Sequence, residues 1–299
     1  MPVKDQLIRA AAANNAVRAF AATTRDTVEE ARTRHLTSPV VTAALGRLMT
    51  AALMMGAMLK NDEDAITLII HGDGPMQGAT VTANRSGDVK GFAKDPAVWL
   101  PLKENGHLDV GTAIGGGTLT VIRDQPGGLP YSGQIELVDG EIANDVTHYF
   151  AVSEQVPSSV GLGVLVDTDQ SVRQAGGFIV QLLPDCPDGV IDRIESNLRS
   201  LSSVTEMLEN GFTPEMILSS VLDGLDMQVL ATEPVRFHCS CSRERVAGLL
   251  KSLGADELRA MLADDKPVEV QCHFCSETYH FSDEEVESLI CEHCEHMSY

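Results

Sequence analysis

The sequence predicts an α+β protein in which a large N-terminal domain is followed by a helical linker and a small C-terminal domain that binds zinc through four cysteines. Three observations predict this. In the first part of the chain, strand-like segments are grouped as meanders and do not alternate strictly with helices. Past Pro184, apolar residues recur at helical spacing. Finally, four of the seven cysteines form two close pairs near the C-terminus.

These changes of pattern predict the domain boundaries. We place the N-terminal domain at residues 1–184, the linker at 185–235, the zinc-binding domain at 236–290 and a tail at 291–299. Within the first domain, alternating apolar residues predict strands at 65–71, 79–84, 89–92, 117–123, 134–138, 162–167 and 178–184. Asp139–Gly140 is typical of a hairpin turn, and Asn144–Asp145 of a helix start.

One long apolar segment, residues 39–59, could be a membrane span or a buried helix. Ser38 and Pro39 are typical of a helix start, because Ser caps and Pro fits the first turn. Arg47 and two threonines interrupt the segment, so we predict the central buried helix of a soluble domain.

Gly115–Gly117 lead into a strand with no lysine behind them, which favours a turn over a phosphate loop.

The linker is predicted to contain two short amphipathic helices. The first carries apolar residues from Ile191 to Leu208 and ends at Gly211, and the second begins at Thr213–Pro214. Two such helices have no room for a core of their own. We therefore expect their apolar faces to dock on a neighbouring part of the chain.

Composition limits the function classes. The 299-residue chain has 43 acidic and 22 basic residues and a net charge of −21, which argues against nucleic acid as a partner. No secretory signal is evident, so we expect a cytoplasmic protein without a membrane partner. Paired cysteines in that compartment indicate metal or redox chemistry in place of a permanent disulfide framework.

The two cysteine pairs are Cys239 with Cys241 and Cys272 with Cys275. Two short pairs far apart in sequence are typical of a tetrahedral zinc site, with four thiolates about 2.3 Å from the metal. We predict one Zn²⁺ per chain in the reduced form. Alternating residues on both sides of the second pair place it at the tip of a hairpin, whereas a thioredoxin-type pair opens a helix.

The same thiolates could also act as a switch. Zinc-bound thiolates react with oxidants, and Arg236, Arg243 and Arg245 add positive charge beside the first pair. Loss of the metal would come close to unfolding so small a domain, since structural zinc is worth on the order of 10 kcal/mol. The spacing alone also fits a static zinc ribbon in a binding module or a thiol–disulfide oxidoreductase.

Sequence segments along nearly the whole chain resemble the redox-regulated 33-kDa heat-shock chaperone family. They are Ser38–Arg47, His71–Met76, Ser153–Ser158, Val160–Val166, Gly176–Pro184, Cys239–Val246 and Cys272–Cys275. The resemblance implies an α+β N-terminal domain, a metastable linker and a zinc domain that senses oxidants. It implies zinc ligation by Cys239, Cys241, Cys272 and Cys275, and disulfides Cys239–Cys241 and Cys272–Cys275 after oxidation.

The family resemblance further implies an ATP-independent holdase, not an enzyme, that binds unfolding proteins and is commonly a homodimer when active. It assigns no client-contacting residues.

Two features depart from the family pattern. Cys291 and Cys294, with His293 and His296, could form another redox pair or a weak metal site, although we favour a solvated tail. Cys186 stands alone beside Pro187, and we expect it to be inert.

Overall fold

The computed structural model describes residues 4–263 and 267–296, with side chains described as far as Cys291. The chain divides into two compact units between His238 and Cys239. Residues 185–235, the predicted linker, group with the first unit. Each unit has buried apolar clusters of its own.

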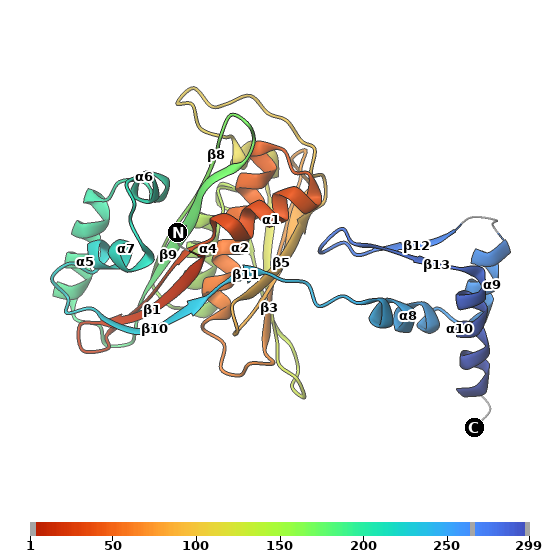
Figure 1. Ribbon diagram of the computed structural model, residues 1–299. Coiled ribbons are helices and arrows are strands. Elements are labelled where there is room, and N and C mark those ends of the chain that lie inside the picture. Colours follow the sequence, from red (N-terminus) through yellow and green to blue (C-terminus); the bar gives the residue numbers. More distant parts are fainter. Residues whose placement is uncertain (1–3, 264–266, 297–299) are drawn as a thin grey trace. The chain divides into compact units, whose positions relative to one another are not determined.

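The first unit contains two β-sheets whose strands run mostly antiparallel. Its five-stranded sheet has the order β10-β1-β2-β9-β8 and its six-stranded sheet the order β11-β5-β4-β3-β6-β7 (Figure 1). The mixture of sheets and helices is the α+β class that the sequence predicts. The strands are β1 (Gln6–Ala12), β2 (Val17–Thr23), β3 (Ala65–Gly72), β4 (Gly78–Asn84), β5 (Asp88–Ala93), β6 (Gly117–Asp124), β7 (Tyr131–Glu136), β8 (Ser158–Val166), β9 (Val172–Leu182), β10 (Gln228–Pro234) and β11 (Arg236–Phe237).

Helix α2 (Pro39–Gly56) is the core of this unit. It contacts β3, β4 and β5 of one sheet and β8 and β9 of the other. The Ser38 hydroxyl accepts a hydrogen bond from the Val41 N–H at 3.5 Å, as the predicted cap requires. Every residue from Val40 to Gly56 is buried except Arg47, whose guanidinium pairs with Glu141 at 2.7 Å. Although α2 is long and apolar enough to cross a membrane, it is a buried core helix, as predicted.

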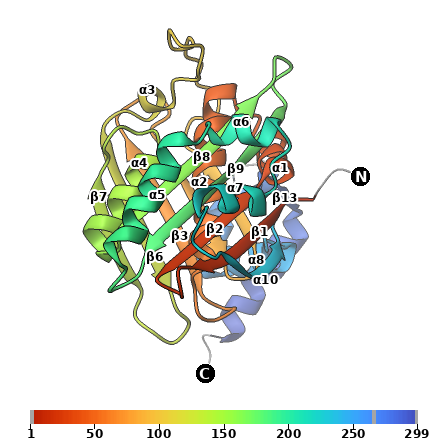
Figure 2. The same cartoon turned by 90° about the vertical axis from the view of Figure 1, so that its left-hand side faces the viewer.

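The five-stranded sheet is covered on both faces, because alternate side chains point to opposite sides. Leu7, Phe20 and Ile179 point toward the cluster around α2. Ile8, Ala19 and Val180 point toward a second cluster, which three helices complete. Figure 2 shows these helices lying over the strands: α5 (Asp188–Ser200), α6 (Val204–Glu209) and α7 (Pro214–Val221).

The linker therefore has three helices, not two. The predicted helix over 191–208 is interrupted at 201–203, because Ser203 caps a new helix by accepting from the Glu206 N–H at 3.2 Å. The second predicted helix starts as expected, with the Thr213 hydroxyl accepting from the Met216 N–H at 3.3 Å. The expected docking of these helices on a neighbour is also confirmed, because their apolar residues pack on the sheet.

Asp139–Gly140 does not form the predicted hairpin turn. Strand β7 pairs with β6, and the loop that joins the two strands comes before β7, not after it. Residues 137–142 lead instead into helix α4 (Ala143–Tyr149) and the π-helix η1 (Phe150–Glu154). A helix does start at the predicted place, and Asp145 lies in its first turn. Its carboxylate accepts hydrogen bonds from the N–H groups of Val138 and Ile142, at 2.6 and 2.8 Å, and so holds the turn before the helix.

Helix α1 (Arg25–His35) follows β2. The sequence analysis does not predict the short helix α3 (Val110–Ile114) or strands β10 and β11. Strand β10 pairs with β1, and β11 pairs with β5 in the other sheet. Arg236 donates to Asp88 at 2.7 Å, and the His238 N–H donates to the Val89 carbonyl at 2.8 Å. The last part of the linker is thus fixed to the edges of both sheets directly before Cys239.

The second unit is small. It contains α8 (Arg243–Ser252), α9 (Ala255–Ala263), the hairpin β12 (Val268–Gln271) and β13 (Thr278–Phe281), and α10 (Asp283–His296). The hairpin agrees with the sequence prediction. Beyond residue 290 the sequence predicts a tail, but α10 continues to His296. Cys291 lies exposed on this helix, and the side chains of His293, Cys294 and His296 fall outside those described.

Candidate metal centre

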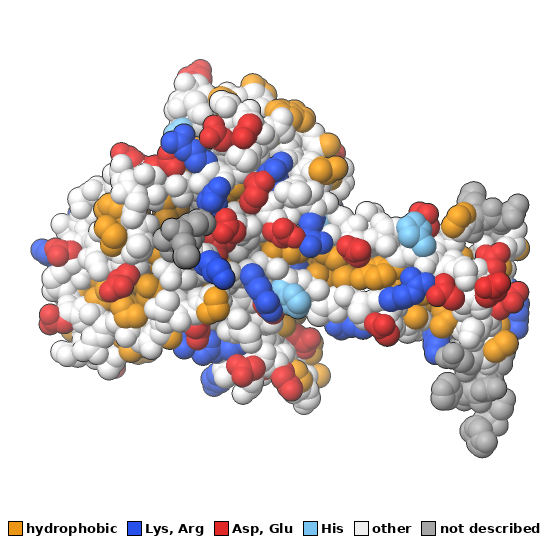
Figure 3. All heavy atoms as spheres, in the orientation of Figure 1, with side chains coloured by type: hydrophobic (Ala, Val, Ile, Leu, Met, Phe, Trp, Pro, Cys, Tyr) orange, Lys and Arg blue, Asp and Glu red, His pale blue; other side chains and the backbone are white. Residues whose placement is uncertain are grey.

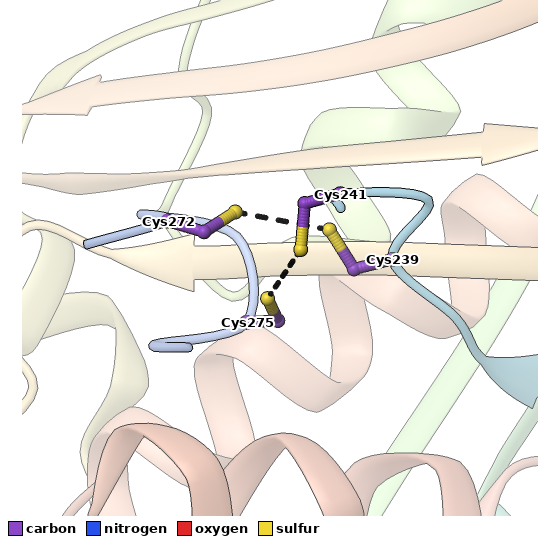
Figure 4. A group of neighbouring side chains, drawn as sticks. All are labelled: Cys239, Cys241, Cys272 and Cys275. Carbon is purple, nitrogen blue, oxygen red and sulfur yellow. Dashed lines mark hydrogen bonds between the residues drawn. The ribbon is translucent and has the colours of Figure 1, made fainter. Parts of the chain in front are cut away.

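Two loops of the second unit bring four thiols together. Cys239 and Cys241 lie in the segment between β11 and α8, and Cys272 and Cys275 lie in the turn of the β12–β13 hairpin (Figure 4). That turn is closed by backbone hydrogen bonds from Cys272 N–H to Glu277 O and from Ser276 N–H to Cys272 O, both 2.8 Å. Ser276 has a φ of 58°, the left-handed conformation that folds the chain back into β13.

The four sulfurs are gathered in one cluster. Cys239 Sγ lies 3.8 Å from Cys272 Sγ, and Cys241 Sγ lies 3.2 Å from Cys275 Sγ. All four lie within 4.8 Å of one another. Bonds of about 2.3 Å to a central ion require sulfur separations of about 3.8 Å. The cysteines are free thiols, and Cys275 is buried. The cluster is therefore a candidate metal site.

Electrostatics favour a cation between these thiols. Burial raises the pKa of Cys239 and that of Cys275 above the usual value for a thiol. Burial acts in the same direction on Cys241, but a hydrogen bond from Tyr279 and the neighbouring thiols lower its pKa overall. Four thiolates at this distance would repel one another. The positive charge of a bound metal ion would offset that repulsion and would favour the deprotonated form of its thiol ligands.

Tyr279 belongs to the site, and the sequence analysis missed it. Its hydroxyl donates a hydrogen bond to Cys241 Sγ at 3.2 Å. Strand β13 places it there, since Tyr279 pairs with Val270 across the hairpin and follows the turn that carries Cys275. One feature of the sequence could have indicated this role: Tyr279 is an aromatic residue with a polar hydroxyl, in the strand directly after a cysteine-containing turn.

The three arginines expected to act on the thiols are partnered elsewhere in the described structure. Arg236 donates to Asp88, and Arg243 pairs with Glu285 at 2.7 Å and stacks over the Phe281 ring. Each of these two arginines therefore pairs with a carboxylate. Arg245 donates to the carbonyl and hydroxyl of Ser240, at 3.0 and 2.8 Å. It holds the residue between Cys239 and Cys241, so its role is to shape the loop.

Comparison with known proteins identifies the family. The family model for the Hsp33 protein matches residues 5–282. The chain belongs to the Hsp33 family. It is 52% identical to a 33 kDa chaperonin of Agathobacter rectalis over 96% of this chain and 100% of that protein. It is 48% identical to a 33 kDa chaperonin of Bacillus licheniformis over 95% of this chain and 98% of the relative.

A solved Hsp33 structure has the same fold. The crystal structure of the 33 kDa chaperonin of Thermotoga maritima superposes with a TM-score of 0.92 at 35% identity, covering 98% of this chain and 100% of that one. The resemblance and the α+β class predicted from sequence are therefore confirmed. The chain is a chaperone of the Hsp33 family, a family whose members bind unfolded proteins.

Replacing Tyr279 by Phe should weaken metal binding. The change removes the hydroxyl that donates to Cys241 Sγ while keeping the ring, and loss of such a supporting hydrogen bond typically costs about tenfold or more in affinity. Competition of the reduced, zinc-loaded protein with a chromogenic chelator measures this. Tyr131→Phe, at an exposed tyrosine on β7, is the matched control. Equal zinc affinity of the Tyr279→Phe variant and the parent would contradict the assigned role.

Proposed function

We propose that this Hsp33-family chain is a redox-regulated, ATP-independent holdase whose four-cysteine centre holds one zinc ion in the reduced state. The observation that supports this most is the convergence of four thiols in a unit with a very small core. In this proposal the active form is a homodimer in the cytoplasm. Its partners are unfolding proteins, and neither nucleic acid nor a membrane takes part.

Zinc fits the donor set. Four sulfurs in a tetrahedral arrangement suit zinc or iron, and zinc has no redox chemistry of its own. Cys239, Cys241, Cys272 and Cys275 would be its ligands. When bound, zinc supplies the positive charge that keeps all four cysteines as thiolates. Its loss would leave the four thiols clustered with no ion to hold their loops together.

Oxidation removes the ligands. We propose that Cys239 pairs with Cys241 and Cys272 with Cys275. Each pair of thiolates gives up two electrons to one peroxide, forms one S–S bond, and the peroxide takes up two protons and leaves as water. A disulfide between cysteines separated by one residue closes a small, strained ring, which makes it easy to reduce again. The position of Cys272 and Cys275 in a hairpin turn does not favour a thioredoxin-like oxidoreductase.

Loss of zinc would destabilise the second unit because little else holds it. Apart from Cys275, its apolar core has few buried members: Val246, Leu250, Leu258, Val268, Phe281, Val286, Leu289 and Ile290. A core of this size supplies only a few kcal/mol, whereas structural zinc contributes on the order of 10 kcal/mol. Removing the larger contribution should therefore unfold the unit.

The surface for clients is proposed to lie under the linker helices. They cover an apolar sheet face formed by Ile8, Ala10, Ala12, Val17, Ala19, Ala21, Phe178 and Val180. The linker's final segment runs through β10 and β11 into Cys239. Unfolding of the second unit would leave that segment less firmly held. Helices α5–α7 would then be free to loosen as well. Hydrophobic side chains already show at the surface over this helical layer (Figure 3).

Peroxide treatment should release zinc and switch on protection of a client. We expect close to one zinc per chain to appear in a chelator assay, together with suppressed light scattering from a thermally unfolding test protein. Cys272→Ser should abolish the oxidant response, and Cys186→Ser, at a cysteine of the first unit, should leave it intact. Zinc release without any client protection would refute the holdase. Protection with zinc fully retained would refute the switch.

Loosening α7 should activate the reduced protein. Ile217 is fully buried against the sheet. Its replacement by Ala should lower the free energy of unfolding by about 3 kcal/mol. Met216→Ala changes the neighbouring residue on the same helix, which is 45% exposed, and serves as control. We expect zinc-loaded, reduced Ile217→Ala to suppress client aggregation and Met216→Ala not to. Circular dichroism checks that both variants remain folded. Equal inactivity of two folded variants would contradict a client surface under α7.

A further inference from the structure

The last strand of the linker, β10, is attached to the first unit with little apolar burial. No residue from Gln228 to Pro234 is buried, and the side chains of Val229 and Leu230 are exposed. Backbone pairing joins β10 to β1 at the edge of the five-stranded sheet (Figure 1). Apolar packing therefore contributes little to holding this strand, although the strand leads to the metal centre.

One carboxylate on β10 connects it to both sheets. Glu233 lies opposite Leu7, whose side chain points toward the cluster around α2, so the two side chains share that inner face. Its Oε1 accepts a hydrogen bond from Arg9 of β1 at 3.2 Å. Both carboxylate oxygens also accept from Nη1 of Arg85, each at 3.5 Å, and Arg85 lies in the turn between β4 and β5 of the other sheet. We call Arg9, Arg85 and Glu233 the charge latch.

The charge latch is sheltered and unequal in charge. The side chains of Arg9, Arg85 and Glu233 are 28%, 19% and 31% exposed, so salt screens their ion pairs less than fully exposed ones. Two guanidiniums share the single carboxylate, and among the described residues no other acidic side chain pairs with either. The Nε of Arg9 is buried and has no partner in the part of the chain that the structure describes. Glu233 thus holds together two like charges.

The three charges are divided between the linker and the surface on which it docks. Arg9 and Arg85 belong to the sheets, and only Glu233 belongs to the linker. Their attraction therefore acts only while β10 is in place, and it contributes directly to the free energy of docking. When β10 leaves, water can solvate both guanidiniums, so the released state gains nothing from the pairing. A change at Glu233 should shift the docking equilibrium more than the stability of the sheets.

We propose that Glu233 is a positioning residue that sets how readily the linker is released after the metal centre is lost. The proposal rests on the redox-regulated holdase described above and names a contact that restrains its linker. Unfolding of the second unit frees the chain beyond His238, and the charge latch then decides how long β10 stays paired. Arg236, which donates to Asp88 at 2.7 Å, adds a second, more exposed pair at the same end. A weaker latch should give faster activation after the same loss of zinc.

Hydrogen exchange of the reduced, zinc-loaded full chain tests the charge latch. Glu233→Gln keeps the size of the side chain but leaves Arg9 and Arg85 without their counter-charge. We expect the amides of β10 to exchange at least about tenfold faster than in the parent, because the docked state loses its pairing. Zinc affinity in the chelator competition should not change. Glu195→Gln is the matched control, because the ion pair of Glu195, with Arg199, lies within α5.

A double variant separates charge from packing. In Glu233→Gln the two guanidiniums repel each other, so a second change, Arg85→Gln, should relieve part of that repulsion. We expect Glu233→Gln/Arg85→Gln to slow the exchange of β10 again, several-fold below that of Glu233→Gln alone. If the effects of the two single changes simply multiply in the double variant, the charges are not coupled and the charge latch is overturned.

Client protection measures the consequence for activation. After the same peroxide dose, zinc release should follow one time course in the parent and in Glu233→Gln, whereas suppression of client aggregation should begin several-fold sooner in the variant. Equal exchange of β10 in the two proteins, both folded by circular dichroism, would overturn the charge latch. Faster exchange without earlier protection would overturn its link to activation and leave the holdase standing. If the oxidised parent protects no client, the holdase fails, and the exchange of β10 alone decides whether Glu233 holds the linker.

Discussion

In the proposed account, the second unit is held together by a metal ion between four sulfurs, which lie within 4.8 Å of one another. The two loops that carry the cysteines are separate in sequence, and each has its own local hydrogen bonds. Thiolates so close repel one another unless a cation lies between them. The local structure, with Ser276, Arg245 and Tyr279 as supports, has the form of a metal-ligand shell.

The two units differ in how they are stabilised. In the first, α2 is buried between two sheets, and apolar packing is sufficient to hold the fold. The second has a small core and a cluster of four thiols. The linker helices belong structurally to the first unit, yet their chain leads straight into Cys239. In the proposed mechanism this contrast lets an oxidant change one unit drastically while the scaffold that presents apolar surface stays folded.

Features set by local pattern could be predicted from the sequence. The buried helix α2 follows from its cap and apolar length, the β12–β13 hairpin from its alternation, and the cysteine cluster from pair spacing. Features set by distant partners could not. Strand β10 is mostly exposed, so its residues show no burial pattern, and it exists because β1 offers a free edge. Tyr279 and the true partners of Arg236 and Arg243 likewise appear only once the chain has folded.

The most direct test of the metal's role is to remove it without oxidising the protein. The reduced full chain would be treated with a zinc chelator and followed by amide hydrogen exchange. We predict that β12, β13 and α8 lose protection while β3 and β6 keep theirs, and that added zinc restores the original pattern. Unchanged protection of the hairpin and α8 in metal-free, reduced protein would contradict the account.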